Sequence, residues 1–195
     1  MRRLHLIGYL LLLAIPLTGS AAEGDAAVWD LSEIYPSVEA WDQAREEVLK
    51  DLELIEARRD TLGDSADALY EALALVSDVT RKAARVSAYA TLRADEDLRV
   101  TETQERRQLT QIMFARLNEA TAWMQPELLR VGEEVINAYI KEDERLDRFA
   151  FQLDDSLRNA PHTLGDEAEE TLAYFSQAFG APFNIYSMVA NSDIP

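Results

Sequence analysis

The sequence has no cysteine and only two histidines among its 195 residues. Without cysteine no disulfide can form, and no lipid anchor can be attached to one. A catalytic zinc ion needs three protein ligands, usually rich in histidine, and residues 23–195 offer His162 alone. A serine nucleophile would likewise have only His162 as its base, and no nucleophile elbow is present. We therefore assign no catalytic, metal-binding or cofactor-binding residue, and interpret His162 as part of a loop before a helix.

Basic residues are few as well. There are 19 Lys and Arg against 36 Asp and Glu, which gives a formal net charge of −17. A chain this acidic repels nucleic-acid phosphates and anionic lipids, so we expect neither as a partner. Glycine is also scarce, with seven residues, and none of the glycines forms a phosphate-binding loop. Hydrophobic residues make up 48% of the chain, which argues against disorder and favours one domain.

The N-terminus has the pattern of a secretory signal peptide. Two arginines precede an apolar run over residues 4–17, and Ser20 and Ala22 are small residues at the spacing of a cleavage site. The run is about 14 residues long, shorter than the ~20 that a membrane-spanning helix needs, which makes a retained anchor the weaker alternative. We predict a signal peptide over residues 1–22, cleavage after Ala22, and export to the periplasm or the medium with no membrane contact afterwards.

The central part of the chain, residues 64–125, contains neither glycine nor proline. At about 1.5 Å per residue one straight helix of this length would approach ~90 Å, too long for a chain of 22.0 kDa. We predict antiparallel helices in an all-α bundle, with bends near Ser77-Asp78 and across residues 94–100. Two apolar stripes at helical spacing support this: Leu69, Ala72, Val76, Val79, Ala83, Val86 and Ala90, then Leu109, Met113, Leu117, Ala120 and Met124.

Before this stretch we expect an extended lead-in over residues 23–36 and then a helical domain over residues 37–195. Anchoring on the bundle is the ordinary role of aromatic side chains and is favoured over ligand contact for Trp29, Ile34 and Tyr35. Ser37 is a predicted helix N-cap. The buried stripe of that first helix comprises Trp41, Ala44, Val48, Leu52 and Ile55.

Further helix boundaries follow from caps and breakers. We expect the first helix to end at Gly63 and the next to be capped by Ser65 or Asp64. Pro126 indicates a restart, and Gly132 a further interruption. Later stripes comprise Val135, Ile136, Tyr139 and Ile140, then Leu146, Phe149, Ala150, Leu153 and Leu157, and finally Leu172, Phe175, Ala178 and Phe179.

The acidic bend at residues 95–97 allows two interpretations. Asp95 and Asp97 could contribute to a calcium site, but the ligand loop with its central glycine is missing. A solvated bend, or an ion pair with Arg93, is favoured. The acids at positions 166, 167, 169 and 170 are interpreted as residues that complement the positive end of a helix.

Four local motifs, in this order and spacing, resemble the N-terminal region of the oligoendopeptidase F family. They are Trp29-Asp-Leu-Ser-Glu-Ile-Tyr-Pro36 with Trp41, Tyr89-Ala-Thr-Leu-Arg93 with Asp95-Glu-Asp97, Pro161-His-Thr-Leu164, and Ala190-Asn-Ser-Asp-Ile194. The resemblance extends over roughly residues 28–195. It implies a mostly helical zinc metallopeptidase of the thimet-oligopeptidase kind, in which this region forms one wall of a cleft for short peptides. The zinc-binding His-Glu-x-x-His helix of the family lies well downstream of the matched region.

Two hypotheses follow for the function. The first is that the chain is the N-terminal helical lobe of an exported oligoendopeptidase F-like enzyme, incomplete at its C-terminus and inactive without its partner, the catalytic lobe. This hypothesis expects an apolar face, around Phe175, Phe179, Phe183 and Tyr186, where the second lobe docks. The alternative is a self-standing periplasmic helical module that binds peptides or a partner protein without catalysis.

Overall fold

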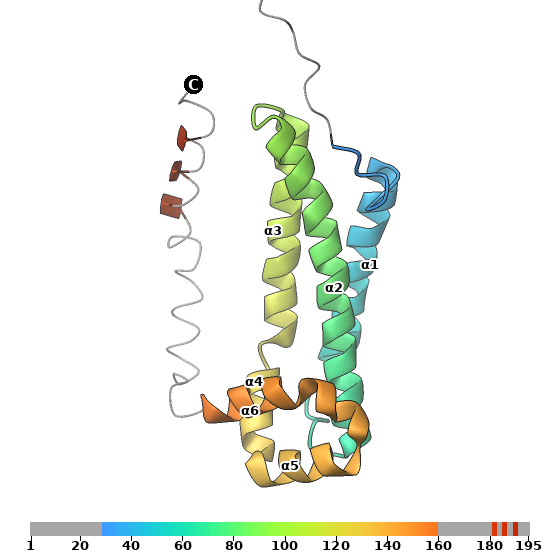
Figure 1. The fold of residues 1–195 in the computed structure, drawn as a ribbon, viewed down its shortest axis with the longest axis vertical. Coiled ribbons are helices and arrows are strands. Elements are labelled where there is room, and N and C mark those ends of the chain that lie inside the picture. The colour runs from blue at the N-terminus through green and yellow to red at the C-terminus, as the bar shows by residue number, and fades with distance from the viewer. Residues whose placement is uncertain (1–28, 160–180, 183–184, 187–188, 191–195) are drawn as a thin grey trace, which may run out of the picture.

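A computed structural model describes residues 29–159 and the pairs 181–182, 185–186 and 189–190 (Figure 1). Within these residues every regular element is helical, which confirms the predicted all-α class. The elements are α1 (Val38–Glu56), α2 (Ala66–Glu96), α3 (Thr101–Thr121), α4 (Met124–Val131), α5 (Glu133–Glu142), the 3-10 helix η1 (Glu144–Phe149) and α6 (Ala150–Arg158). None of the described helices is both long and apolar enough to pass through a lipid bilayer.

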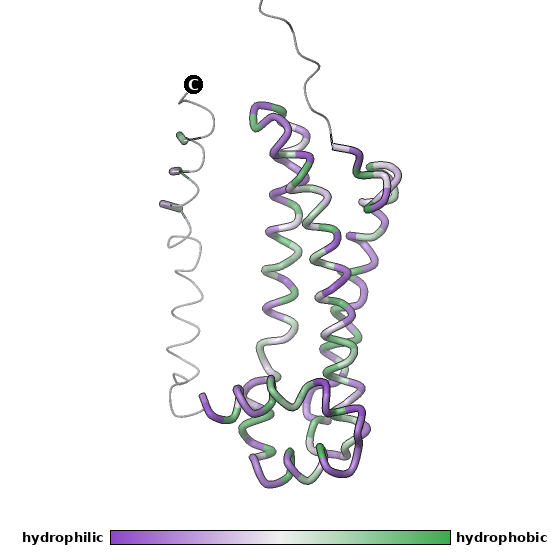
Figure 2. Tube along the Cα trace, viewed as in Figure 1, coloured by the Kyte–Doolittle hydropathy of each residue, from purple (hydrophilic) through white to green (hydrophobic). Residues whose placement is uncertain are grey.

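The helices α1, α2 and α3 lie side by side as an elongated antiparallel bundle, and α4 to α6 form a base across one end of it (Figure 1). Hydrophobic and hydrophilic residues alternate along the three long helices, as expected for helices that bury one face (Figure 2). Serine side chains start the first two: Ser37 Oγ accepts a hydrogen bond from Ala40 N at 3.2 Å, and Ser65 Oγ accepts one from Ala68 N at 3.1 Å. Both predicted caps are thereby confirmed.

The helix α2 corrects one of the two predicted bends. It runs through Ser77 and Asp78 without interruption for 31 residues, about 46 Å. Kinks need a proline, a glycine or an inserted group, and none is present there. Instead, Asp78 pairs with Arg81 and, at 3.2 Å, with Lys82, at the i+3 and i+4 spacings that stabilise a helix. The second predicted bend is confirmed, because α2 ends at Glu96 and α3 begins at Thr101.

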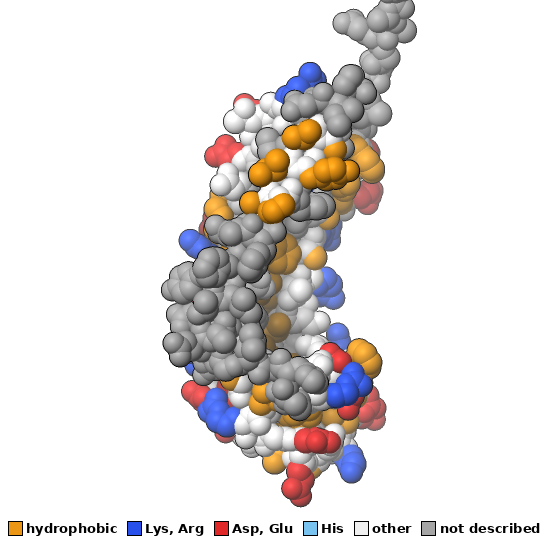
Figure 3. All heavy atoms as spheres, turned by 90° about the vertical axis from the view of Figure 1, so that its left-hand side faces the viewer, with side chains coloured by type: hydrophobic (Ala, Val, Ile, Leu, Met, Phe, Trp, Pro, Cys, Tyr) orange, Lys and Arg blue, Asp and Glu red, His pale blue; other side chains and the backbone are white. Residues whose placement is uncertain are grey.

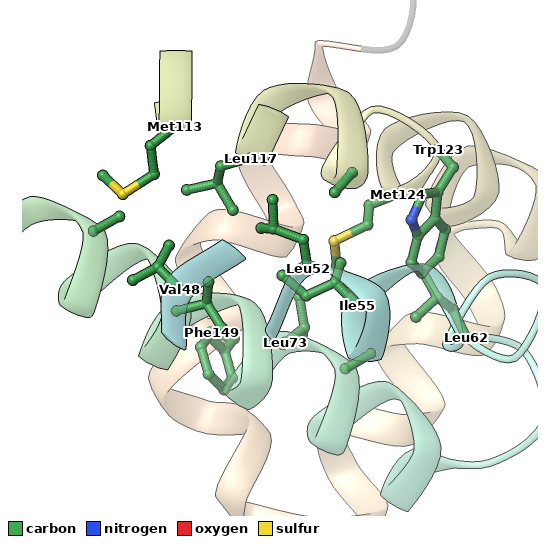
Figure 4. Packing of buried hydrophobic residues seen from close by; sticks show 14 of the residues in the cluster. Val48, Leu52, Ile55, Leu62, Leu73, Met113, Leu117, Trp123, Met124 and Phe149 are labelled. Atoms are coloured by element: carbon green, nitrogen blue, oxygen red, sulfur yellow. The ribbon is translucent and has the colours of Figure 1, made fainter. Parts of the chain in front are cut away.

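The core follows the predicted stripes closely. Val79, Ala83, Val86 and Ala90 of α2 are fully buried, and the alanines let the neighbouring helices approach closely. Some predicted stripe residues are only partly buried against this core, namely Ala44, Val76, Leu109, Tyr139, Ile140 and Leu157. Val135, also predicted to be buried, is 38% exposed. The core continues from the long helices into the base, where side chains of α1, α2, α3, α4 and η1 meet (Figure 4). One cluster therefore holds both parts of the described chain together.

The described part of the lead-in, residues 29–36, is non-helical, as predicted, but the side chain of Trp29 does not anchor it. Trp29 is 54% exposed, whereas Leu31 is buried at 4% and Ile34 and Tyr35 pack against the core. The cause is a local turn, in which Asp30 Oδ1 accepts a hydrogen bond from Ser32 N at 3.1 Å. This turn points Leu31 inward in place of the tryptophan.

The first helix also ends earlier than predicted, at Glu56 and not at Gly63. The turn residue Asp60 adopts a positive φ of 65°, so the chain leaves the helix before the glycine. Gly63 meets a different requirement, since a Cβ atom there would lie 3.2 Å from Val131 Cγ2 of α4. The glycine permits close packing between this loop and the base.

Candidate functional site

An open hollow of about 420 Å³ lies where α2 passes over the base. Its walls come from α2, from the end of α3, from α4 and from α6. The apolar part of the lining is formed by Leu73, Val76, Met124 and Leu128. This size falls within the ~300–1,000 Å³ range of ligand sites, although the hollow is open to solvent on one side.

The rest of the lining is polar but uncharged. It comprises Ser77, Thr80, Thr121, Gln125, Gln152 and Ser156. Gln125 Nε2 donates to the backbone carbonyl of Ser156 at 3.1 Å, and the Thr121 hydroxyl donates to the carbonyl of Leu117 at 2.9 Å. The hydroxyls of Ser77 and Thr80 and the amide of Gln152 make no hydrogen bond to any residue that the structure describes.

The helix α4 supports the hollow from behind. Its Glu127 is only 3% exposed, and its two carboxylate oxygens accept hydrogen bonds from Asp60 N and Leu62 N, both at 2.8 Å. Arg130 pairs with the Asp60 carboxylate at 3.2 Å. The loop between α1 and α2 is therefore fixed to α4, which carries Met124, Gln125 and Leu128 into the hollow.

A second set of contacts fixes the base to the start of α2. The Tyr139 hydroxyl donates to the carbonyl of Gly63 at 2.7 Å. Arg145 lies 4.2 Å from the ring centroid of Tyr70 and donates to Asp67 at 2.6 Å. Hydrogen bonds from Arg145 lower the pKa of Asp143 below its ordinary value. The residues of these ion pairs do not line the hollow. Acidic and basic side chains are mixed around this end of the molecule (Figure 3).

The acidic bend between α2 and α3 is an ion-pair cluster. Arg93 pairs with Glu96 at 3.2 Å, Asp95 lies 3.8 Å from Arg107, and Asp97 accepts from the Arg99 guanidinium at 2.8 Å. Hydrogen bonds from Arg99 lower the pKa of Asp97 to about 2. The predicted ion pair of Arg93 is thus present, and the two aspartates proposed for calcium are paired with arginines.

Several residues singled out in the sequence lie outside the described residues, namely His162, Phe175, Phe179, Phe183 and the acids at 166–170. Of the predicted docking face only Tyr186 is described, and it is 70% exposed.

The hollow itself was not predicted, because its lining comes from segments up to about 80 residues apart in the chain. One signal for it exists in the sequence. Helical spacing places four of the lining residues on one face of α2, at and beside the buried stripe, with steps of three, one and three residues: Leu73, Val76, Ser77 and Thr80.

Comparisons with known proteins agree with this fold. A family model described as Oligopeptidase F matches residues 127–195. The oligopeptidase PepF of Bacillus subtilis is 31% identical over 166 residues, which is 85% of this chain and 25% of that protein. The group B oligopeptidase PepB of Streptococcus agalactiae is 26% identical over 85% of this chain and 28% of its own. The chain spans about a quarter of the length of these relatives.

Solved structures show the same similarity to peptidases. The crystal structure of oligoendopeptidase-F from Enterococcus faecium superposes with a TM-score of 0.71 at 26% identity, over 81% of this chain and 31% of that one. A putative peptidase from Chlamydophila abortus shares the fold, with a TM-score of 0.59. The helical bundle with its base thus resembles the N-terminal part of these peptidases. In this region the chain is similar in sequence and in fold to the oligoendopeptidase F family.

The family is generally zinc dependent, so we tested whether the residues at hand fit such an ion. Residues 29–159 and the three later pairs contain no group of three or more His, Cys, Asp or Glu side chains that could hold a metal. Neither histidine of the sequence, His5 or His162, begins a His-Glu-x-x-His motif. The described residues therefore do not fit a zinc ion.

Proposed function

We propose that this chain is the N-terminal helical lobe of an exported oligoendopeptidase F-like metallopeptidase, in which it forms one wall of the oligopeptide-binding cleft. The observation that carries the proposal is the pattern of coverage. The relatives match 85% of this chain but only 25–28% of themselves, and they are named oligopeptidases. A lobe of a larger peptidase accounts for both values.

The described residues are suited to shaping a space for a peptide. The base, α2 and the end of α3 line an open hollow with hydroxyl and amide groups that can bond to a peptide main chain. They contain no histidine or cysteine, the usual source of zinc ligands and of activated nucleophiles. In the proposed assignment the catalytic lobe supplies the zinc ion and the chemistry, and these 195 residues alone do not cleave peptides.

The coding DNA beyond the codon for Pro195 tests the lobe assignment. We expect an open frame that encodes a His-Glu-x-x-His helix, and chelator-sensitive cleavage of a quenched fluorescent peptide by its full product. A stop codon at that point, together with the 195-residue product alone in the cell, would contradict the proposal and favour the self-standing binding module.

Export is tested separately. We expect N-terminal sequencing of the mature protein to begin at Glu23, after cleavage behind Ala22. Retention of residues 1–22 in the purified protein would contradict the export part of the proposal and leave the lobe assignment standing.

A further inference from the structure

The hollow between α2, α4 and α6 has a lining without charged side chains. In a chain with a formal net charge of −17, none of its lining residues is charged. Its floor is apolar, with Leu73, Met124 and Leu128 buried beneath it. Above this floor stand the side chains of Ser77, Thr80 and Gln152, which have no hydrogen-bond partner among the described residues.

This combination limits the ligand. A charged group that entered the hollow would lose part of its water and meet no opposite charge in the lining, which costs more than partial burial of a neutral polar group with a hydrogen bond. Hydroxyl and amide side chains donate to and accept from a peptide main chain equally well, whatever its sequence. An open hollow on one side suits a segment of extended chain better than an enclosed small molecule.

We propose that this hollow binds an uncharged segment of the peptide substrate, with Ser77, Thr80 and Gln152 bonding to its main chain and the apolar floor receiving a neutral side chain. This inference rests on the proposed function, since it names a subsite and a preference within the peptide-binding cleft. The lobe thereby contributes specificity at a distance from the bond that is cleaved.

The geometry behind the hollow is fixed in a way that suits a preformed subsite. Gln125 of α4 bonds to the carbonyl of Ser156 of α6 at 3.1 Å, so two of the walls are joined directly. Glu127 holds the same helix against the loop that precedes α2 through its two 2.8 Å hydrogen bonds. A subsite whose walls are already positioned loses less conformational entropy when a peptide binds.

Photo-crosslinking tests the inference on the 195-residue chain. The probe is a seven-residue peptide of alanine, glutamine and leucine, acetylated and amidated at its ends, with a central benzoylphenylalanine. We expect mass spectrometry to locate the crosslinks on α2, α4 and α6 beside the hollow. In a second probe the residues on either side of the label are Lys and Glu, so the net charge stays zero. We expect it to label these helices several-fold less, because its charges must be desolvated.

Arginine substitutions at the rim provide the second readout. Ser77 and Thr80 are exposed helix positions, so Ser77→Arg and Thr80→Arg fill and charge the hollow without disturbing the core. We expect each to reduce labelling at the hollow by about tenfold or more. Gln108→Arg, at an exposed position of α3 outside the lining, carries the same change in charge and should leave labelling unchanged.

Three results would overturn the inference. The first is that the uncharged probe labels residues away from the hollow, or labels none, and that Thr80→Arg does not change this result. The second is that both probes label the hollow equally. The third is a melting temperature that falls by several degrees in Ser77→Arg and Thr80→Arg but not in Gln108→Arg, which would show that another part of the chain already fills the hollow. None of these outcomes bears on the lobe assignment, which the coding DNA and the activity of its full product decide.

Discussion

The long helices α1 to α3 and the base formed by α4, α5, η1 and α6 are stabilised in different ways. The helices α1 and α2 bury an apolar stripe along their length, with Val79, Ala83 and Val86 of α2 fully buried. The helix α3 buries its stripe only between Thr110 and Ala120. The base consists of short helices that are marginal alone. It is held in place by side chains that bond to distant backbone groups, as Glu127 does with Asp60 and Leu62. Both regions share one buried core, to which the base contributes Ile136, Leu146 and Leu153, and the base depends in addition on these few specific hydrogen bonds.

The largest expected effect falls in the long helices. Trp41 is 2% exposed, stacks on Tyr89, and its indole Nε1 donates to the carbonyl of Val86 at 2.9 Å. Trp41→Ala should lower the free energy of unfolding by about 3–5 kcal/mol, as measured by urea denaturation. The control is Trp29→Ala, which should cost under about 0.5 kcal/mol because Trp29 is half exposed. Equal losses in the two variants would contradict the placement of the lead-in.

The second largest loss of stability is expected in the base. Glu127→Ala removes the acceptor of one buried and one partly buried backbone N–H group, which should cost about 2–4 kcal/mol of unfolding free energy. Hydrogen exchange should accelerate at the amides of Asp60 and Leu62 before the long helices are affected. Glu133→Ala, at an exposed position in the first turn of α5, is the matched control. Uniform acceleration over α1 to α3 in Glu127→Ala would show that the two regions unfold as one.

A third prediction concerns the exposed apolar side chains. Ile185 and Tyr186 are 62% and 70% exposed, as a surface that docks a second lobe should be. We expect the isolated chain to bind a hydrophobic dye, and Tyr186→Ser to reduce that binding. Tight, cooperative melting without dye uptake would favour the self-standing module over the lobe.

The smallest effect is local and electrostatic. Hydrogen bonds from Arg99 lower the pKa of Asp97 from 3.8 to about 2. Because the pKa is depressed in the folded protein, this contribution to stability is present above about pH 4 and is lost as the pH falls towards 2. Arg99→Gln should return the pKa of Asp97 towards 3.8 in an NMR titration of its carboxyl group. An unchanged pKa would mean that the pair does not form in solution.

The contrast between the two regions also explains what could be predicted from the sequence. The spacing of a stripe such as Leu69 to Ala90 indicates which helix face is buried, so the helical class could be predicted. Both serine caps and the bend at residues 94–100 could also be predicted, from local sequence signals. The long-range bonds of Glu127 leave no such record, because an acid after a helix start usually serves the helix dipole. The early end of α1 and the inward turn at Leu31 depend on similar local or long-range contacts. The hollow could not be predicted, because that would have required the relative positions of all four helices that line it.

Hydrolysis of a quenched fluorescent peptide by the purified 195-residue chain, with zinc present and then with a chelator, tests the central claim most directly. A lobe that shapes the cleft without supplying the zinc ligands should show no turnover above background in either condition. Chelator-sensitive turnover by this chain alone would contradict the account.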